Sequence, residues 1–448
     1  MRTYNKRIAF LISDQHFIPH GGIGSFCKGF TEMCNRIGWK VDILLDKQPN
    51  NSHFKELITK MGGNVLYPES PLKYSDHVGT FAFSDTINFE KIINFRKVIV
   101  ESLSKNLYDM MVCNTQEAMT AAYAMTLNKD IPVVFYTHLH SMIFRKAQNF
   151  SDVFLDSYHN FYNKHMDFDD IYIGTQSKKN IAELTSYGAN NCVLLQMPMS
   201  ERGLLERYNG KREGVLFIGR WEEGKNPEAY IRVMKECMLP CRVMTNESGK
   251  KKFEKAFSEV GITNYTIKAG ITGQEKVNFI HSSDTFFMPS LRENYPFAFL
   301  ECLGHMPCVV LDNQDWSDNF DSQYYHKVNI KQAANLIKTI YGGTQLSTAL
   351  DYVKKLDELV SQGWIRFLFD FVPRKAKTDK AAINNFNTVC YSEYLESLNR
   401  KQLAREDFES VFTNKHKFRI IYTDNDTWLT KDPTFEPNTQ EENLFEGL

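Results

Sequence analysis

Glu293 and Glu301 are the two residues of this chain whose type and spacing most suggest chemistry. The apolar run 285–289 precedes the first carboxylate, and a helical pattern contains the second, so the pair spans a loop-to-helix junction. One carboxylate would therefore face the end of a strand, and the other would lie on the first turns of a helix. Such a pair can bind the hydroxyl groups of a sugar and the diol of a ribose.

Two basic residues, Arg220 and Lys225, follow the apolar segment 215–218. Cations placed just past the end of a strand can hold a diphosphate and neutralise the charge that it gains as a leaving group. Taken singly, two glutamates at this spacing occur by chance, and the two cations would suit a solvated loop. All four together, in this order within an α/β pattern, favour a binding site.

Short apolar segments alternate with helical periodicity in two rounds, which predicts an α/β fold with parallel sheets covered on both faces. Ligands of such sheets collect at the carboxyl ends of the strands. Helices are expected at 26–37 and 89–104. The expected strands are 8–12, 41–45, 108–113, 132–136 and 171–174 in the first round, and 215–218, 241–245, 265–268, 285–288 and 308–311 in the second.

The chain is long enough for two domains. We predict a first domain at 1–200 and a second at 201–375, with the polar stretch 200–212 as a linker. Residues 376–448 would form a C-terminal extension, in which a helix at 381–403 crosses back to the first domain. An acidic tail that is mostly solvated would follow from Tyr422.

The pattern Gly-Arg-x4-Lys followed by Glu-x7-Glu resembles the retaining family-4 glycosyltransferases. The resemblance implies a GT-B fold, with two Rossmann-like domains whose parallel sheets face each other across a cleft, and a UDP-sugar donor without any further cofactor. It implies that Arg220 and Lys225 hold the diphosphate, that Glu301 binds the ribose, and that Glu293 contacts the sugar. The other implied donor-binding residues are Gly21, Gly22, Asn294, Tyr295, Pro296 and Phe297.

Gly21, Gly22 and Gly24 form a glycine-rich turn between the first strand and a helix. Glycines there let the backbone approach a ligand, and the N-terminus of a helix favours phosphate. Their spacing departs from the dinucleotide fingerprint, and the nearest acidic residue after the second strand is Asp46. A dehydrogenase is therefore the poorer alternative.

Two histidines, His138 and His140, follow the fourth strand, and the basic pair Arg145 and Lys146 comes next. A third ligand with suitable spacing is missing, so a metal site is not expected. The segment Tyr-x-His-x-His-Ser at 136–141 resembles the phage glucosyltransferases that modify 5-hydroxymethylcytosine in duplex DNA. Those enzymes carry an acidic residue between the histidines, where this chain has Leu139. The resemblance implies that His138 is catalytic and that both histidines and the basic pair bind the acceptor.

The composition of the chain limits the kinds of partner that it can be expected to bind. Lys and Arg number 53 against 54 Asp and Glu, so the net charge of −1 gives no overall attraction to polyanions. DNA binding would need a local patch from Arg145, Lys146, Lys178, Lys179, Lys211 and Arg212. Nine scattered cysteines favour a reducing cytoplasm, that of the host for a phage protein, and no apolar stretch is long enough for a membrane span. The chain is expected to be a monomer.

The sequence thus predicts transfer of glucose, or of a pentose such as arabinose, to 5-hydroxymethylcytosine in phage DNA, with retention of configuration implied by the resemblance. A bacterial family-4 enzyme acting on lipopolysaccharide, capsule or another saccharide is the alternative. A nucleotide-sugar-binding protein without catalysis is a third reading, and the presence of all four charged residues argues against it.

Overall fold

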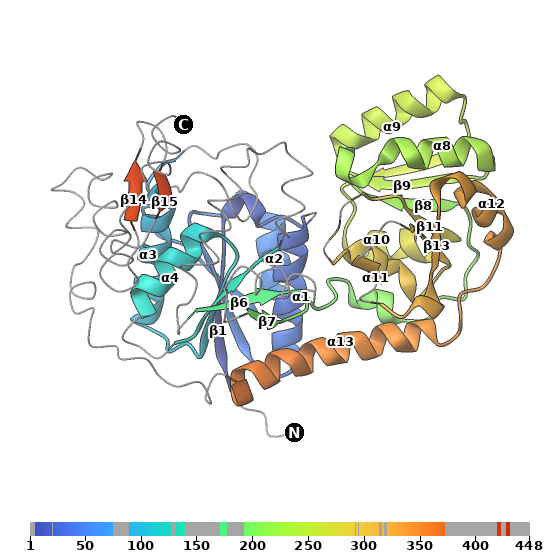
Figure 1. The fold of residues 1–448 in the computed structure, drawn as a ribbon. Helices are drawn as coiled ribbons and strands as arrows, with labels where there is room; N and C mark the ends of the chain where they lie inside the picture. The colour runs from blue at the N-terminus through green and yellow to red at the C-terminus, as the bar shows by residue number, and fades with distance from the viewer. Residues whose placement is uncertain are drawn as a thin grey trace. The chain divides into compact units, whose positions relative to one another are not determined.

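The chain divides into two compact units, residues 1–196 with 363–448 (unit 1) and residues 197–362 (unit 2). Figure 1 shows the elements of each unit. The computed structural model describes residues 5–19, 21–74, 89–126, 131–138, 171–176, 192–291, 293, 295–312, 316–317, 320–371, 419–422 and 427–430.

Unit 1 contains a seven-stranded sheet in the order β3-β2-β1-β4-β5-β6-β7, and every pairing in it is parallel. Figure 1 shows α1 and α2 on one side of this sheet and α3 and α4 on the other. The elements are β1 (Arg7–Ile12), η1 (Asp14–His16), α1 (Gly22–Arg36), β2 (Lys40–Leu45), α2 (Ser52–Lys60), β3 (Gly63–Leu66), α3 (Phe89–Leu103), β4 (Met110–Cys113), α4 (Gln116–Thr126), β5 (Val133–Tyr136), β6 (Ile171–Thr175) and β7 (Cys192–Leu194).

Helix α1 packs on the sheet of unit 1 through an aromatic stripe at helical spacing. The rings of Phe26 and Phe30 lie 5.2 and 5.3 Å from the ring of Phe10 in β1, measured between centroids. Trp364, near the end of helix α13 (Ala349–Arg366), joins them at 4.8 Å from Phe30. All four side chains are buried, so the start of α1 is held firmly over the end of β1.

Unit 2 contains a six-stranded sheet in the order β10-β9-β8-β11-β12-β13, again with every pairing parallel. The expectation of two parallel-sheet, Rossmann-like domains is confirmed. The elements are η2 (Arg202–Leu205), β8 (Val215–Ile218), η3 (Glu223–Lys225), α8 (Pro227–Cys237), β9 (Cys241–Thr245), α9 (Glu247–Val260), β10 (Tyr265–Ala269), α10 (Gly273–His281), β11 (Thr285–Met288), α11 (Phe297–Leu303), β12 (Cys308–Leu311), η5 (Ser322–Tyr324), β13 (His326–Val328), α12 (Ile330–Ile340) and α13.

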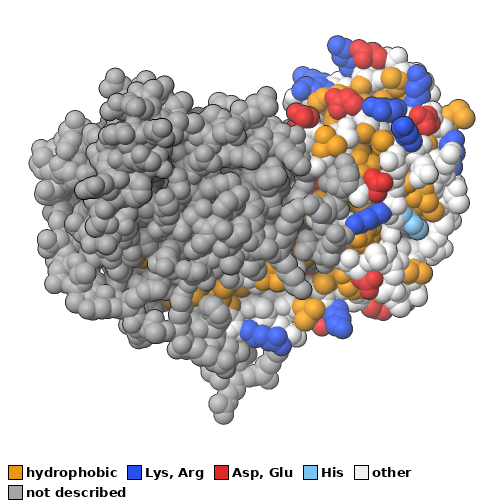
Figure 2. All heavy atoms as spheres, viewed as in Figure 1, with side chains coloured by type: hydrophobic (Ala, Val, Ile, Leu, Met, Phe, Trp, Pro, Cys, Tyr) orange, Lys and Arg blue, Asp and Glu red, His pale blue; other side chains and the backbone are white. Residues whose placement is uncertain are grey.

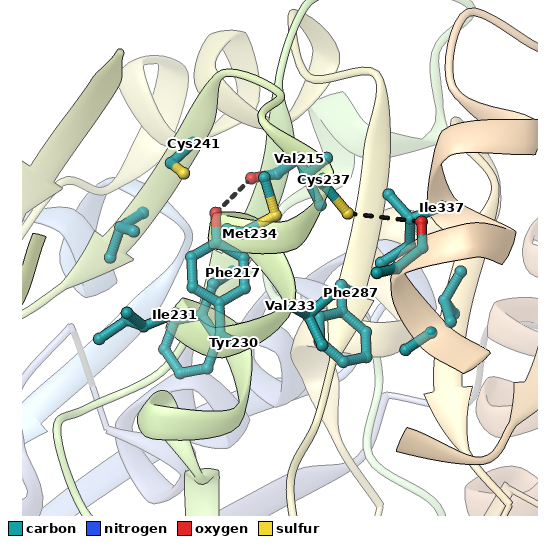
Figure 3. Packing of buried hydrophobic residues seen from close by; sticks show 14 of the residues in the cluster. Val215, Phe217, Tyr230, Ile231, Val233, Met234, Cys237, Cys241, Phe287 and Ile337 are labelled. Atoms are coloured by element: carbon teal, nitrogen blue, oxygen red, sulfur yellow. Dashed lines mark hydrogen bonds between the residues drawn. The ribbon is translucent and has the colours of Figure 1, made fainter. Parts of the chain in front are cut away.

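The core of unit 2 lies between one face of this sheet and the helices α8, α9 and α12 (Figure 3). Tyr230 of α8 is fully buried there, and its hydroxyl donates a hydrogen bond of 2.6 Å to the carbonyl of Val215. Cys237, at the end of the same helix, donates from its thiol to the carbonyl of Ala334 in α12 at 3.5 Å. These polar atoms are satisfied inside an apolar cluster, so the sheet and its helices form a rigid support for the loops beyond the strands.

Residues 200–212, the predicted linker, begin just after the division between the two units and are partly buried. The segment belongs to unit 2, and the side chains of Leu204 and Leu205 in η2 are buried. The carbonyl of Leu204 also accepts a hydrogen bond of 2.5 Å from Nε2 of His305. Polar composition suggested solvent exposure, but two leucines in a single short turn are enough to dock the segment.

The structure also differs from the prediction in short elements at the edges of the sheets and near the C-terminus. Strands β3, β7 and β13 were not predicted, and each borders a sheet and is only partly buried. Residues 419–422 and 427–430 form an antiparallel pair, β14 (Arg419–Tyr422) with β15 (Thr427–Thr430), where only a solvated tail was expected after Tyr422. Segment 364–371 is buried at Trp364 and continues into the π-helix η6 (Phe367–Phe371). The predicted helix at 381–403 lies outside the described residues.

The visible face of unit 2 carries both signs of charge, with Lys and Arg side chains interspersed among Asp and Glu (Figure 2). Mixed charge of this kind is typical of an ordinary solvated surface. None of the helices in the described part of the chain combines the length and apolar character that a membrane span needs.

Candidate functional site

The strand order of unit 2 reverses between β8 and β11, which are hydrogen-bonded neighbours. The chain leaves β8 and moves to β9 and β10, then returns to β11 and moves the opposite way. The loops beyond the carboxyl ends of β8 and β11 therefore diverge, and such switch points bind ligands in open α/β sheets. The four charged residues that the sequence singled out follow these two strands.

Lys225 and Glu293 meet at this switch point. The ammonium group of Lys225, which ends η3, lies 2.5 Å from Oε1 of Glu293 in the loop after β11. The side chains are 25% and 10% exposed, so the pair is mostly shielded yet reachable from solvent. An ammonium group and a carboxylate side by side can bind a phosphate oxygen and a sugar hydroxyl of one ligand.

Backbone contacts hold the two loops of the pair together. The N–H of Leu291 donates to the carbonyl of Gly224 at 2.8 Å, and Nδ2 of Asn226 donates to the carbonyl of Pro289 at 3.2 Å. Asn226 has a φ of 53°, in the left-handed region that asparagine tolerates better than most residues. This turn directly follows Lys225, so the position of the lysine is set by the backbone of both loops.

Glu301 lies on α11, the helix after the loop of Glu293, and its side chain is only 1% exposed. Its Oε1 accepts from the ammonium group of Lys276 in α10 at 2.5 Å and from the hydroxyl of Ser200 at 3.2 Å. The structure therefore places the predicted ribose carboxylate in a buried ion pair beside the switch point. Neither Lys276 nor Ser200 was predicted, because their sequence separation from Glu301 carries no signal of the contact.

Arg220 differs from Lys225 in being 65% exposed, and it pairs at 3.1 Å with Glu222 of its own loop. Its guanidinium is thus accessible to an incoming anion. Tyr295 and Pro296 are buried, and the ring of Tyr295 packs 5.3 Å from that of Phe320, so these two predicted donor residues shape the loop from within. Phe297 begins α11 and is half-buried, and Asn294 lies outside the described residues.

Unit 1 has its own switch point between β1 and β4. The glycine turn follows β1 there, with Gly21 as the N-cap of α1 and Gly22 as its first residue. A side chain at Gly22 would meet nothing within 4 Å, whereas a Cβ at Gly24 would lie 1.8 Å from the carbonyl oxygen of Ile18. Gly24 is therefore required by packing, and Gly22 borders open space at the N-terminus of the helix.

His138 follows β5 and lies beside the same switch point. Its Nε2 is 2.8 Å from Oδ1 of Asn114, the residue after β4, and its ring packs 5.7 Å from Phe26 and 5.0 Å from Tyr136. Burial, together with the nearby His16 of η1, lowers the pKa of His138 to about 3. The imidazole is therefore neutral at physiological pH.

Most of the other residues that were predicted to bind the acceptor fall outside the part of the chain that the structure describes. Leu139, His140, Arg145, Lys146, Lys178 and Lys179 lie outside the described residues. Of the predicted basic patch, Lys211 is exposed, whereas Arg212 is half-buried and donates from its guanidinium to the carbonyls of His305 and Tyr208.

Asp46, the acidic residue because of which a dehydrogenase remained an alternative function, is fully buried. One carboxylate oxygen accepts from the N–H of Asp14, and the other accepts from the hydroxyl of Tyr74. The two oxygens thus join the loop after β2 to the loop after β1 and to the segment after β3, which removes Asp46 as a ribose ligand. Within the described residues, no three His, Cys, Asp or Glu side chains come together as a metal site would require.

No protein-family model matches the sequence, and no curated protein matches it. Solved structures do resemble it. A TarM variant from S. aureus, in complex with fondaparinux, alpha-GlcNAc-glycerol and UDP, has a TM-score of 0.59 at 11% identity, over 82% of this chain and 100% of that one.

Two further structures resemble the chain at 14% identity. Sucrose-phosphate synthase from Thermosynechococcus elongatus has a TM-score of 0.57 and covers 89% of this chain and 100% of its own. HepE from Anabaena, in complex with UDP and glucose, has a TM-score of 0.53 and covers 88% and 100%. At these identities the likeness shows the fold, which is GT-B.

Proposed function

We propose that this protein is a glycosyltransferase that uses a UDP-sugar donor. The observation that carries the proposal is the Lys225–Glu293 pair at the switch point between β8 and β11, in a chain of GT-B fold. The similar structures add support, because the TarM structure contains UDP and the HepE structure contains UDP and glucose.

Unit 2 would bind the donor. Lys225 and the exposed Arg220 would contact the diphosphate and neutralise the negative charge that builds up as UDP leaves. Glu293, released from part of its contact with Lys225, would accept hydrogen bonds from sugar hydroxyls. Glu301 would accept from the ribose diol while it keeps its ion pair with Lys276.

Unit 1 would serve the acceptor. The open backbone at Gly22 and the neutral imidazole of His138 offer a polar surface without charge beside the switch point of that unit. With retention of configuration, the departing phosphate oxygen could take the proton of the acceptor hydroxyl, so His138 would contribute hydrogen bonding rather than act as a strong base.

We propose 5-hydroxymethylcytosine in duplex DNA as the acceptor, on the strength of the segment 136–141 and the basic pair that follows it. The transferred sugar would be glucose or a pentose. If DNA is the acceptor, activity should fall steeply as salt rises, because phosphate contacts release counterions.

A saccharide hydroxyl is the second candidate acceptor. It is favoured by the TarM structure, whose bound molecules include alpha-GlcNAc-glycerol, and by the similarity to a sucrose-phosphate synthase. Both candidates share the donor chemistry of unit 2 and differ only in what unit 1 would bind.

A transfer assay separates these outcomes. The full chain would be incubated with a panel of UDP-sugars and with duplexes that contain either cytosine or 5-hydroxymethylcytosine, while UDP release and nucleoside mass are followed. Modification of the hydroxymethylated duplex alone would support the DNA acceptor. Transfer only to saccharides would replace that acceptor, and the absence of UDP-sugar binding and turnover would refute the glycosyltransferase proposal.

A further inference from the structure

Two side chains bind the same oxygen of the Glu301 carboxylate. Its Oε1 accepts from the ammonium group of Lys276 at 2.5 Å and from the hydroxyl of Ser200 at 3.2 Å. Each oxygen of a carboxylate offers two lone-pair sites, so these two donors saturate Oε1. A ligand could therefore bind this carboxylate only through Oε2.

The second oxygen of Glu301, Oε2, has no hydrogen-bond partner within the described residues. It is also not one of the described side-chain atoms that are wholly buried without a partner. The 1% of the Glu301 side chain that solvent can reach therefore includes this oxygen. The carboxylate thus has one oxygen bound to the protein and one oxygen in contact with solvent.

Ser200 is fixed by the residues on both sides of it. The N–H of Met199 donates to Oδ1 of Asp357 in α13 at 3.1 Å. Oε1 of Glu201 accepts from the N–H of Gly273 at 3.4 Å, and a carboxylate at the N-terminus of a helix is favourable for the helix dipole. Since Gly273 begins α10, this contact ties Ser200 to the helix of the other donor.

We infer that Lys276 and Ser200 are positioning residues, which hold Glu301 by Oε1 so that Oε2 is presented to the ribose diol of the donor. The identity of this ligand rests on the proposed function. A glutamate that is already held loses little side-chain entropy when the ligand binds, so a fixed carboxylate should read the diol more tightly than a mobile one. Two residues outside the Glu-x7-Glu pattern would then contribute to the recognition of ribose.

Calorimetry with two nucleotides measures how well the site reads the diol. UDP and 2′,3′-dideoxy-UDP differ only in the two hydroxyl groups, so the ratio of their dissociation constants gives the diol preference. The full-length wild type should bind UDP about 10- to 100-fold more tightly, as expected for hydrogen bonds to a charged group. A wild type that binds both nucleotides equally would overturn the inference.

Lys276→Met removes the ammonium group and keeps the apolar stem. We expect the diol preference to fall about 5-fold or more, because the carboxylate is no longer held. A purely structural role of Lys276 would weaken the binding of both nucleotides alike and leave their ratio unchanged. An unchanged or larger preference in a folded variant would contradict the positioning role.

Ser200→Ala is the milder variant and serves if Lys276→Met does not fold. It removes one hydrogen bond from Oε1, so the diol preference should fall about 2- to 5-fold. Ser283→Ala is the matched control, because Ser283 is a buried serine of unit 2 whose hydroxyl accepts from the charged Arg242 at 3.0 Å. The control should lower thermal stability and keep the wild-type preference. An equal loss of preference in both serine variants would indicate general loosening of unit 2 and refute the role of Ser200.

The proposed function fails separately. A wild-type protein that binds neither nucleotide would refute the donor site, and the inference would fall with it. If UDP binds with a diol preference that neither Lys276→Met nor Ser200→Ala lowers, the positioning role is refuted and the proposed function stands.

Discussion

The two sheets of this protein have the same switch-point topology but different side chains in the loops beyond it. In unit 2 the loops beyond the switch point bring a lysine onto a glutamate, with an exposed arginine nearby. In unit 1 the corresponding region holds a glycine turn and a neutral histidine bonded to an asparagine. One topology thus supports either a charged or an uncharged surface, and the loop residues decide which chemistry it serves.

The difference would suit unit 2 to bind a diphosphate and unit 1 to bind a hydroxyl group. A diphosphate needs cations that remain reachable from water, and Lys225 and Arg220 meet that need. A hydroxyl group needs a directed acceptor, which a buried neutral imidazole provides at lower desolvation cost than a carboxylate.

Among the predictions, replacing Lys225 should have the largest effect on activity, because it removes the shielded ammonium group from the site of unit 2. Lys225→Met keeps the apolar stem and leaves Glu293 without its ammonium partner. We expect kcat/KM for a UDP-sugar to fall on the order of 100- to 1000-fold, which corresponds to about 3–4 kcal/mol. Lys268→Met, which breaks an exposed pair with Glu275 in the same unit, is the control and should retain activity.

Glu301→Ala should mainly affect the stability of unit 2. It leaves the ammonium group of Lys276 largely buried without its carboxylate, so the free energy of unfolding should fall by about 3 kcal/mol and the KM for the donor should rise. Denaturant unfolding would measure the loss. The double variant with Lys276→Met should recover part of it, and additive losses would show that the pair is not coupled.

Arg220→Ala should separate binding from stability. The side chain is mostly exposed, so the unfolding free energy should stay within about 0.5 kcal/mol of the wild type. UDP affinity, measured by calorimetry, should fall about 10-fold or more through the lost charged contact. Unchanged affinity would remove Arg220 from the diphosphate site.

The smallest expected effect is on the pH dependence of stability, and it concerns His305, which lies away from both switch points. Burial lowers the pKa of His305 to about 4, against an ordinary value near 6.5. Between these values the unfolded chain binds a proton that the folded chain does not, so this residue makes stability fall as pH decreases from 6.5 to 4.

In His305→Asn the loss of stability between pH 7 and 5 should be smaller than in the wild type by about 1–2 kcal/mol. Denaturant titrations at both pH values would show this. An equal loss in both proteins would mean that His305 does not titrate as inferred.

Much of the fold could be predicted because the central strands are short apolar runs bounded by turn residues. The bounds of β8, β9, β11 and β12 agree with the prediction. Strands β3 and β13 were missed because edge strands are half-exposed and lack a continuous apolar run. The burial of Leu204 and Leu205 within the predicted linker could not be foreseen because it depends on tertiary contacts.

The sequence could predict the types of the site residues and the strands that they follow, but it could not predict which of them contact each other. Lys225 and Glu293 were each expected near a strand end, and only the adjacency of β8 and β11 brings them into contact. Lys276, which holds Glu301, lies on a helix that no motif marked. The contact between Asn114 and His138 likewise depends on the adjacency of β4 and β5.

Calorimetric titration of UDP-glucose into the wild-type protein and into Lys225→Met tests the central claim most directly. The account predicts saturable binding to the wild type and binding at least 100-fold weaker to the variant, since the switch point of unit 2 would lose its shielded cation. Wild-type protein that binds no UDP-glucose, or a variant that binds it equally well, would contradict the assignment of this switch point as the donor site.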